Sequence, residues 1–72
     1  MDSAHIIHMA NQIAKNLAAQ GDEAAATATA NHIRDYWEPR MITALIHANP
    51  TALSPIARAA RATFTNNQPA PQ

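Results

Sequence analysis

Two pairs of ionisable side chains have a spacing that could support chemistry. His5 and His8 are three residues apart, and histidines at this spacing on a helix can share a metal ion. No third ligand follows them, so histidines that face solvent or cap a helix are the simpler interpretation. Asp35 and Glu38 are also three residues apart, close enough in principle for general acid–base catalysis. They flank the expected end of a helix, where salt bridges are the ordinary role of acidic residues.

The rest of the chain holds no recognisable catalytic constellation. It has no nucleophile pattern, no Gly-rich phosphate loop and no flavin or nicotinamide fingerprint. Cysteine is absent, which excludes disulfides and thiolate zinc sites. We therefore predict no catalytic residue, no metal ligand and no cofactor in this chain.

The composition indicates a small core. Hydrophobic residues make up 47% of the 72, but 18 of these 34 are alanine. Burying one large apolar side chain contributes about 1.5–3 kcal/mol, whereas ordering each residue costs roughly 1.5 kcal/mol. Sixteen larger apolar residues are therefore few for the task, and association with a partner is the expected remedy.

The charge balance and the N-terminal segment exclude further classes of function. Five Lys/Arg against five Asp/Glu give no net charge, so the electrostatic attraction that nucleic-acid binding relies on is missing. The N-terminal apolar residues are interrupted by His8, Asn11 and Gln12, which fits neither a signal peptide nor a membrane span. We expect a cytoplasmic protein without nucleic-acid or membrane partners.

One glycine and five prolines divide the chain into helices. Asp2 or Ser3 can cap a first helix that ends at Gly21, in the left-handed position after a helix, and Asp22 can cap a second over 23–37. Pro39 starts a third helix over 39–48, and Ser54 with Pro55 starts a fourth over 55–64. The predicted fold is all-α, a bundle of about four short helices within one domain at 1–65, with a disordered tail at 66–72.

Apolar residues at helical spacing predict which faces turn inward. The glycine turn makes the first two helices an antiparallel hairpin, over which the last two must close. The expected inward residues are Ile6, Ala10, Ile13 and Leu17 with Ile7, Ala14 and Ala18 alongside; then Ala26, Ala30, Ile33 and Trp37; then Met41, Ile42, Leu45 and Ile46; then Ile56, Ala60 and Phe64.

Segment 32–41, "HIRDYWEPRM", concentrates bulk and charge. Arg40 falls in the first turn of the third helix, where the helix dipole disfavours a cation. Either Glu38 or Asp35 compensates locally, or an acceptor on another chain does. Trp37 has a similar choice between the core, an interface, or both.

Polar residues on the helices also allow two interpretations. Asn11 lies at the border of the apolar stripe, where its carboxamide could bond to a partner's backbone or simply face solvent. Arg58 and Arg61 share a face late in the fourth helix; either they are there because cations are favourable near a helix C-terminus without any partner, or they have a functional role.

Two motifs resemble a known family. "HMANQIA" and, after an alanine-rich stretch, "HIRDYWEPRM" resemble the delta subunit of cytoplasmic NAD-dependent formate dehydrogenase, over about residues 5 to 64. The matching residues are Met9, Ala10, Asn11, Gln12, Ile13 and Ala14; then His32, Trp37, Pro39, Arg40 and Met41; and Leu53 and Pro55 before the last helix.

The resemblance implies an accessory subunit without catalytic activity, which assists assembly or stability of an enzyme that oxidises formate and reduces NAD. In that family the molybdenum or tungsten pterin, the iron–sulfur clusters and FMN belong to other subunits, which would be the partners here. We predict partner binding by Asn11, Gln12, His32, Tyr36, Trp37, Arg40 and Met41. The alternatives are a free-standing helical homodimer that regulates or binds a ligand, and a small metal enzyme that uses His5 and His8.

Overall fold

The computed structural model describes residues 2–67. The first helix, α1, spans Ser3–Leu17 and continues as a 3-10 turn, η1, over Ala18–Gln20. The Asp2 carboxylate accepts a hydrogen bond from the Ala4 N–H at 3.2 Å, which satisfies one of the free amides at the helix start. This confirms a cap at the first of the two predicted positions.

The turn at Gly21 differs in detail from the prediction. Its φ of +98° confirms that a residue without a Cβ is needed, but its ψ of 152° lies outside the left-handed helical region. The Gly21 carbonyl accepts a hydrogen bond from the Ala25 N–H at 2.7 Å. Gly21 is therefore the N-cap of the second helix, and the prediction that Asp22 takes this position is wrong. Asp22 is instead the first helical residue, and its carboxylate still lies at the positive end of the dipole.

The next two helices are separated by two extended residues. Helix α2 spans Asp22–Tyr36 and helix α3 spans Pro39–His47. Glu38 is extended, with ψ 153°, because the Pro39 ring excludes the helical conformation for the residue before it. Pro39 itself fits the first turn of α3, as predicted.

A second 3-10 turn, η2 (Pro50–Ala52), leads to helix α4 (Pro55–Asn67). The Ser54 hydroxyl accepts a hydrogen bond from the Ala57 N–H at 3.3 Å, which confirms the predicted cap. The helix continues three residues beyond its predicted end at 64. Of the predicted tail, residues 68–72 lie outside the described part of the chain.

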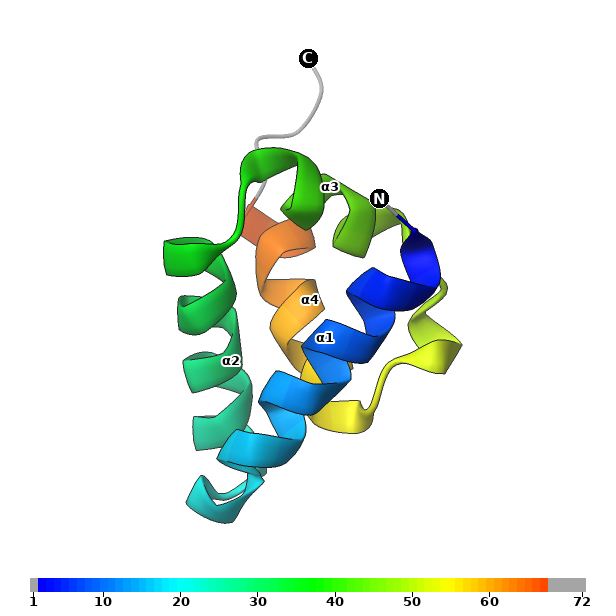
Figure 1. Cartoon of the computed structure of the whole chain (residues 1–72). Coiled ribbons are helices and arrows are strands. Elements are labelled where there is room, and N and C mark those ends of the chain that lie inside the picture. The colour runs from blue at the N-terminus through cyan, green and yellow to red at the C-terminus, as the bar shows by residue number, and fades with distance from the viewer. Residues whose placement is uncertain (1, 68–72) are drawn as a thin grey trace.

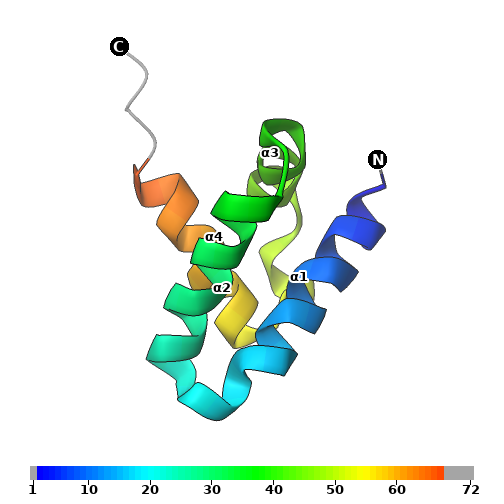
Figure 2. The same ribbon diagram turned by 60° about the vertical axis from the view of Figure 1, so that its left-hand side comes forward.

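Helices α1 and α2 form a hairpin, α4 packs against one side of it, and α3 lies at one of its ends (Figure 1). Helices α1 and α2 are antiparallel and meet at the Gly21 turn, and α3 lies across the open end of this hairpin (Figure 1). Helix α4 packs most extensively on α2 and also contacts α1 (Figure 2). The all-α fold and the order of packing agree with the prediction.

Alanine makes up much of the core. Among the described residues the buried hydrophobic side chains are Ile6, Ala10, Ala14, Ala25, Ala30, Ile33, Trp37, Leu45, Ala48, Leu53, Ala57 and Ala60. Most predicted inward positions are buried or half-buried, but Ala18 is exposed. Thr29 is fully buried between the alanines of α2, and its hydroxyl has no partner among the described residues.

No helix within residues 2–67 combines the length and the apolar character needed to span a membrane.

Replacement of Gly21 tests the turn. Nothing lies within 4 Å of a Cβ added at Gly21, so a side chain would meet no steric obstacle there. We expect Gly21→Ala to lower the free energy of unfolding by about 1–3 kcal/mol, because this conformation is nearly restricted to glycine. Urea unfolding followed by circular dichroism measures it, with Gln20→Ala as the control in the same exposed turn. An unchanged midpoint for Gly21→Ala would show that the turn relaxes without cost.

Candidate partner-binding site

Segment 32–41 contains the end of α2, the extended link and the first turn of α3. Trp37 is only 7% exposed and packs in the core with Ile6, Ile33 and Leu45. Met41, in the first turn of α3, is half-buried against the same cluster. Of the roles considered for Trp37, the structure shows the one in the core.

Tyr36 lies beside Trp37 in the sequence but has the opposite environment. Its side chain is 76% exposed, unusual for a residue of this size. The His32 ring lies one turn earlier on α2, with ring centroids 4.7 Å apart and planes tilted by 36°. The two rings are in contact on the surface, where the Tyr36 ring leaves a large aromatic area exposed.

Arg40 is compensated locally, though weakly. Its Nε lies 4.0 Å from the Glu38 Oε1, and its side chain is 82% exposed. Asp35, the other predicted partner, pairs instead with Arg34 at 3.2 Å. A long, exposed ion pair contributes about 0–1 kcal/mol, so the Arg40 guanidinium is able to exchange Glu38 for another acceptor.

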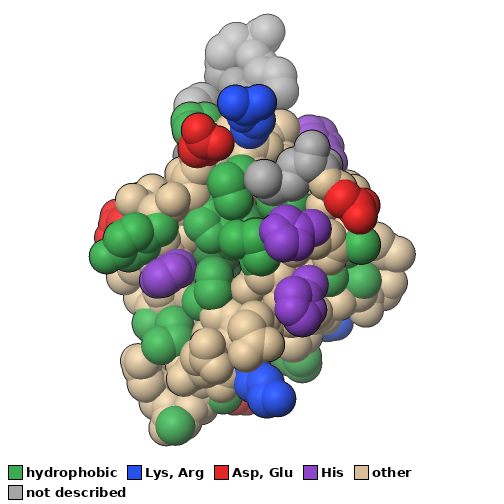
Figure 3. Space-filling view, in the orientation of Figure 1, with side chains coloured by type: hydrophobic (Ala, Val, Ile, Leu, Met, Phe, Trp, Pro, Cys, Tyr) green, Lys and Arg blue, Asp and Glu red, His purple; other side chains and the backbone are tan. Residues whose placement is uncertain are grey.

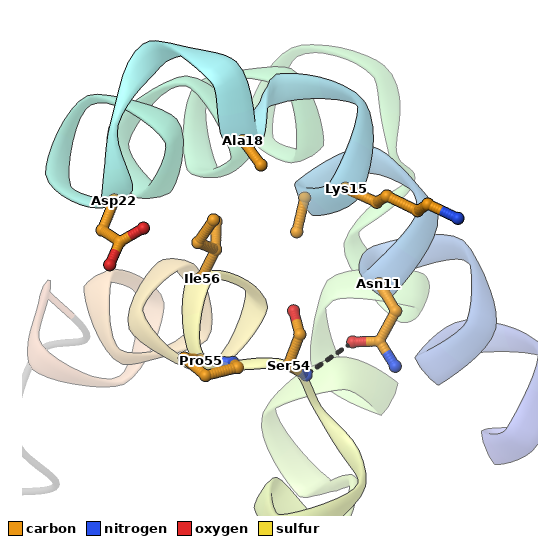
Figure 4. A pocket seen from close by; sticks show the side chains of 8 residues that line it. Asn11, Lys15, Ala18, Asp22, Ser54, Pro55 and Ile56 are labelled. Carbon is orange, nitrogen blue, oxygen red and sulfur yellow. Dashed lines mark hydrogen bonds between the residues drawn. The ribbon is translucent and has the colours of Figure 1, made fainter.

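Asn11 and Gln12 are neighbours with different contacts. The Asn11 amide donates to the Ala52 carbonyl at 3.1 Å, and its carbonyl oxygen accepts from the Ser54 N–H at 2.8 Å (Figure 4). Asn11 thus ties α1 to the segment that starts α4. Gln12 is exposed, with one long contact of 3.5 Å to Asn16 on its own helix.

Arg58 and Arg61 have a role that the sequence did not indicate. Arg58 lies in the first turn of α4, where it donates to the carbonyls of Pro50 (3.1 Å) and Leu53 (3.0 Å). Arg61 donates to the carbonyls of Leu45 (3.2 Å) and Ile46 (3.1 Å) at the end of α3. The prediction that both lie late in α4 and need only its own dipole is therefore wrong. Both side chains donate hydrogen bonds to backbone carbonyls of segments that precede α4. No local sequence pattern identifies these acceptors.

A shallow cleft of about 340 Å³ opens between α1 and the starts of α2 and α4. Lys15 and Asp22 stand at its two sides, and Ile56 lies between them (Figure 4). Its lining is mostly apolar, with no pair of groups arranged as nucleophile and base. This cleft is a candidate binding surface.

The two pairs of ionisable residues singled out in the sequence are not joined by further metal-ligating side chains among the described residues. His5, His8, Asp35 and Glu38 are all exposed. Within residues 2–67 no group of three or more His, Cys, Asp or Glu side chains comes together as a possible metal site. Asp35 and Glu38 each have an arginine partner, as the salt-bridge interpretation expects.

The comparisons with known proteins give one result. A family model described as NADH-dependent formate dehydrogenase delta subunit FdsD matches residues 5–61, which include both motifs and reach from α1 into α4. The comparisons with curated proteins and with solved structures gave no match.

Replacement of Asn11 tests whether its two hydrogen bonds support the fold. Asn11→Ala leaves the half-buried Ser54 N–H without its acceptor, so we expect a loss of about 1–3 kcal/mol in the free energy of unfolding. Gln12→Ala is the matched control, and its effect should stay within about 0.5 kcal/mol because the side chain is exposed. Chemical denaturation measures both. Equal effects would mean that the Asn11 contacts contribute nothing to the fold.

Proposed function

Because this chain belongs to the formate dehydrogenase delta-subunit family, we propose that it is a non-catalytic subunit of such an enzyme. It docks on the larger subunits and supports assembly or stability of the complex that oxidises formate to carbon dioxide and reduces NAD. The match over residues 5–61 carries this proposal, since it covers most of the described chain. A cytoplasmic location follows from the same resemblance.

The chemistry of the side chains supports a role without catalysis. The sequence contains no cysteine, so this chain has no thiolate for an iron–sulfur cluster. The acidic residues and histidines of the described part are exposed, and no three of them come together as a possible metal site. We therefore assign the pterin metal centre, the clusters and FMN to the larger subunits.

The energetics of the core support docking. Seven of the twelve buried hydrophobic residues are alanine, each of which removes little apolar area from water. A partner that covers further apolar surface adds the stability that this core lacks. We propose that this contact also fixes the position of the small helical chain on the larger subunits.

The predicted partner-binding residues divide by their environment. His32, Tyr36 and Arg40 are exposed around the end of α2, and we propose that they touch the partner directly, with Gln12 on α1. Trp37 is in the core and Met41 packs against it, so we propose that they hold the segment that carries Tyr36 and Arg40 in place. Asn11 uses both polar ends of its carboxamide inside the chain, and its proposed contribution is to position the segment before α4.

Omission of this chain during production of the enzyme tests the proposed function. The larger subunits made without it should assemble poorly or lose activity faster on warming, whereas those made with it should form a stable complex that contains the chain. Size-exclusion chromatography, metal and flavin analysis, and the decay of formate-dependent NAD reduction at a fixed temperature measure these effects.

Added-back chain provides the control. Supplying the purified chain from a second gene should restore assembly and thermal lifetime. Identical yield, cofactor content and lifetime with and without the chain would contradict the proposal.

A further inference from the structure

Large apolar side chains are unevenly distributed along the hairpin of α1 and α2. Residues 14–29 run from the last turn of α1 through the glycine turn into the first half of α2, and we call them the turn segment. Leu17 is the only large apolar residue in the sequence of this segment, and it is half-buried. The buried residues of the turn segment are Ala14, Ala25 and Thr29. Packing at this end of the hairpin therefore depends on small side chains.

The opposite end of the bundle holds the bulky side chains. One buried cluster contains Ile6, Ile33, Trp37 and Leu45. On the face seen in Figure 3, hydrophobic side chains gather between α1, α2 and α3, and fewer lie toward the Gly21 turn. Each large side chain removes far more apolar area from water than an alanine does. The hydrophobic stabilisation is thus concentrated at the end that carries Trp37.

Thr29 adds a weak point at the boundary between the two ends. Its side chain is fully buried, and its hydroxyl has no hydrogen-bond partner among the described residues. Such a hydroxyl has lost its hydrogen bonds to water and gained none in return, so it stabilises the closed state less than a methyl group of the same shape does. Thr29 therefore weakens the packing of α2 on its neighbours, α1 and α4.

The turn segment also has few ties to the rest of the chain. Within residues 2–67 no side-chain hydrogen bond or ion pair joins it to α3 or α4, whereas Asn11, just before it, is bonded to the segment that starts α4. Two clefts lie next to it, the cleft of about 340 Å³ toward α1 and a second of about 370 Å³ between α2 and α4. Both clefts are bordered by Asp22, Pro55 and Ile56, so α4 fills the space against the turn segment incompletely.

We infer that the turn segment is a separate opening unit, weakened at Thr29, which loosens from the bundle while the end around Trp37 stays closed. Few buried apolar contacts and few polar ties are the properties of regions that open locally. Its pieces of helix are too short to persist without packing, so opening exposes their backbone amides. Movement of the segment away from Ile56 joins the two clefts into one. The chain thus has, whether or not it docks on a larger subunit, a rigid end that carries residues 32–41 and an adaptable end.

Hydrogen exchange of the full chain, followed for single amides by NMR, tests the inference in the wild type. We expect the amides of residues 26–29 to be protected about tenfold or more weakly than the amides of residues 34–37 on the same helix, relative to the rates of an unfolded chain. Equal protection of the two groups would overturn the inference, because α2 would then open as a whole. A chain without protection at either group would overturn it too, since no end would stay closed.

Thr29→Val replaces the hydroxyl by a methyl group of the same shape. We expect this variant to raise the protection of residues 26–29 by about fivefold or more, because its closed state contains no buried hydroxyl without a partner. Thr27→Val is the matched control, since it makes the same replacement on the same helix at an exposed position, and it should change the protection by less than about twofold. No gain for Thr29→Val, or an equal gain for both variants, would show that Thr29 is not the weak point and would overturn the inference.

Ile6→Val tests whether the two ends open separately. It removes one methylene group from the bulky end, so we expect the protection of residues 34–37 to fall by about threefold or more, while that of residues 26–29 stays within about twofold of the wild type. Circular dichroism confirms that each variant keeps the helicity of the wild type. A parallel fall at both groups of amides would mean that the helices open as one unit, and would contradict the inference.

Discussion

A shortage of large apolar side chains constrains the whole structure. Alanine fills most buried positions of α1, α2 and α4, so the helices can approach closely but each contact removes little apolar area from water. The fold supplements this thin core with polar contacts to the backbone. Asn11, Arg58 and Arg61 each join one segment to the carbonyls or amides of another, and the arginines do so with charge-assisted bonds.

The same constraint explains which aromatic side chain of residues 32–41 is buried and which is exposed. Trp37 is the largest side chain available, and the core needs it, so it is buried in the chain that carries it. Its neighbour Tyr36 is left on the surface, in tilted contact with the His32 ring and without a hydrogen-bond partner among the described residues. In the proposed function, burial of apolar surface between this chain and a larger subunit would add the stability that the core lacks, and the small subunit would become more stable as the complex assembles.

The sequence predicts local features well and long-range contacts poorly. Pro39, Pro55 and Gly21 act through the conformation of their own backbone, so the helix boundaries near them follow from the sequence. The predicted N-cap of α2, Asp22, is wrong by one position, because Gly21 before it takes an unusual ψ and is itself the N-cap. The roles of Arg58 and Arg61 depend on carbonyls between 5 and 16 residues away, and no spacing rule identifies such acceptors. Of the candidate site, the exposure of Tyr36 and the burial of Trp37 needed the structure, because both side chains suit either environment.

Backbone hydrogen exchange of the chain, alone and within the assembled enzyme, tests most directly whether a thin core is completed by a partner. The account predicts that amides of α1 and α2 exchange readily in the isolated chain, with opening free energies below about 5 kcal/mol, and slow by about tenfold or more in the complex. Strong and equal protection of these helices in both states would show that the chain is stable by itself, and would contradict the account.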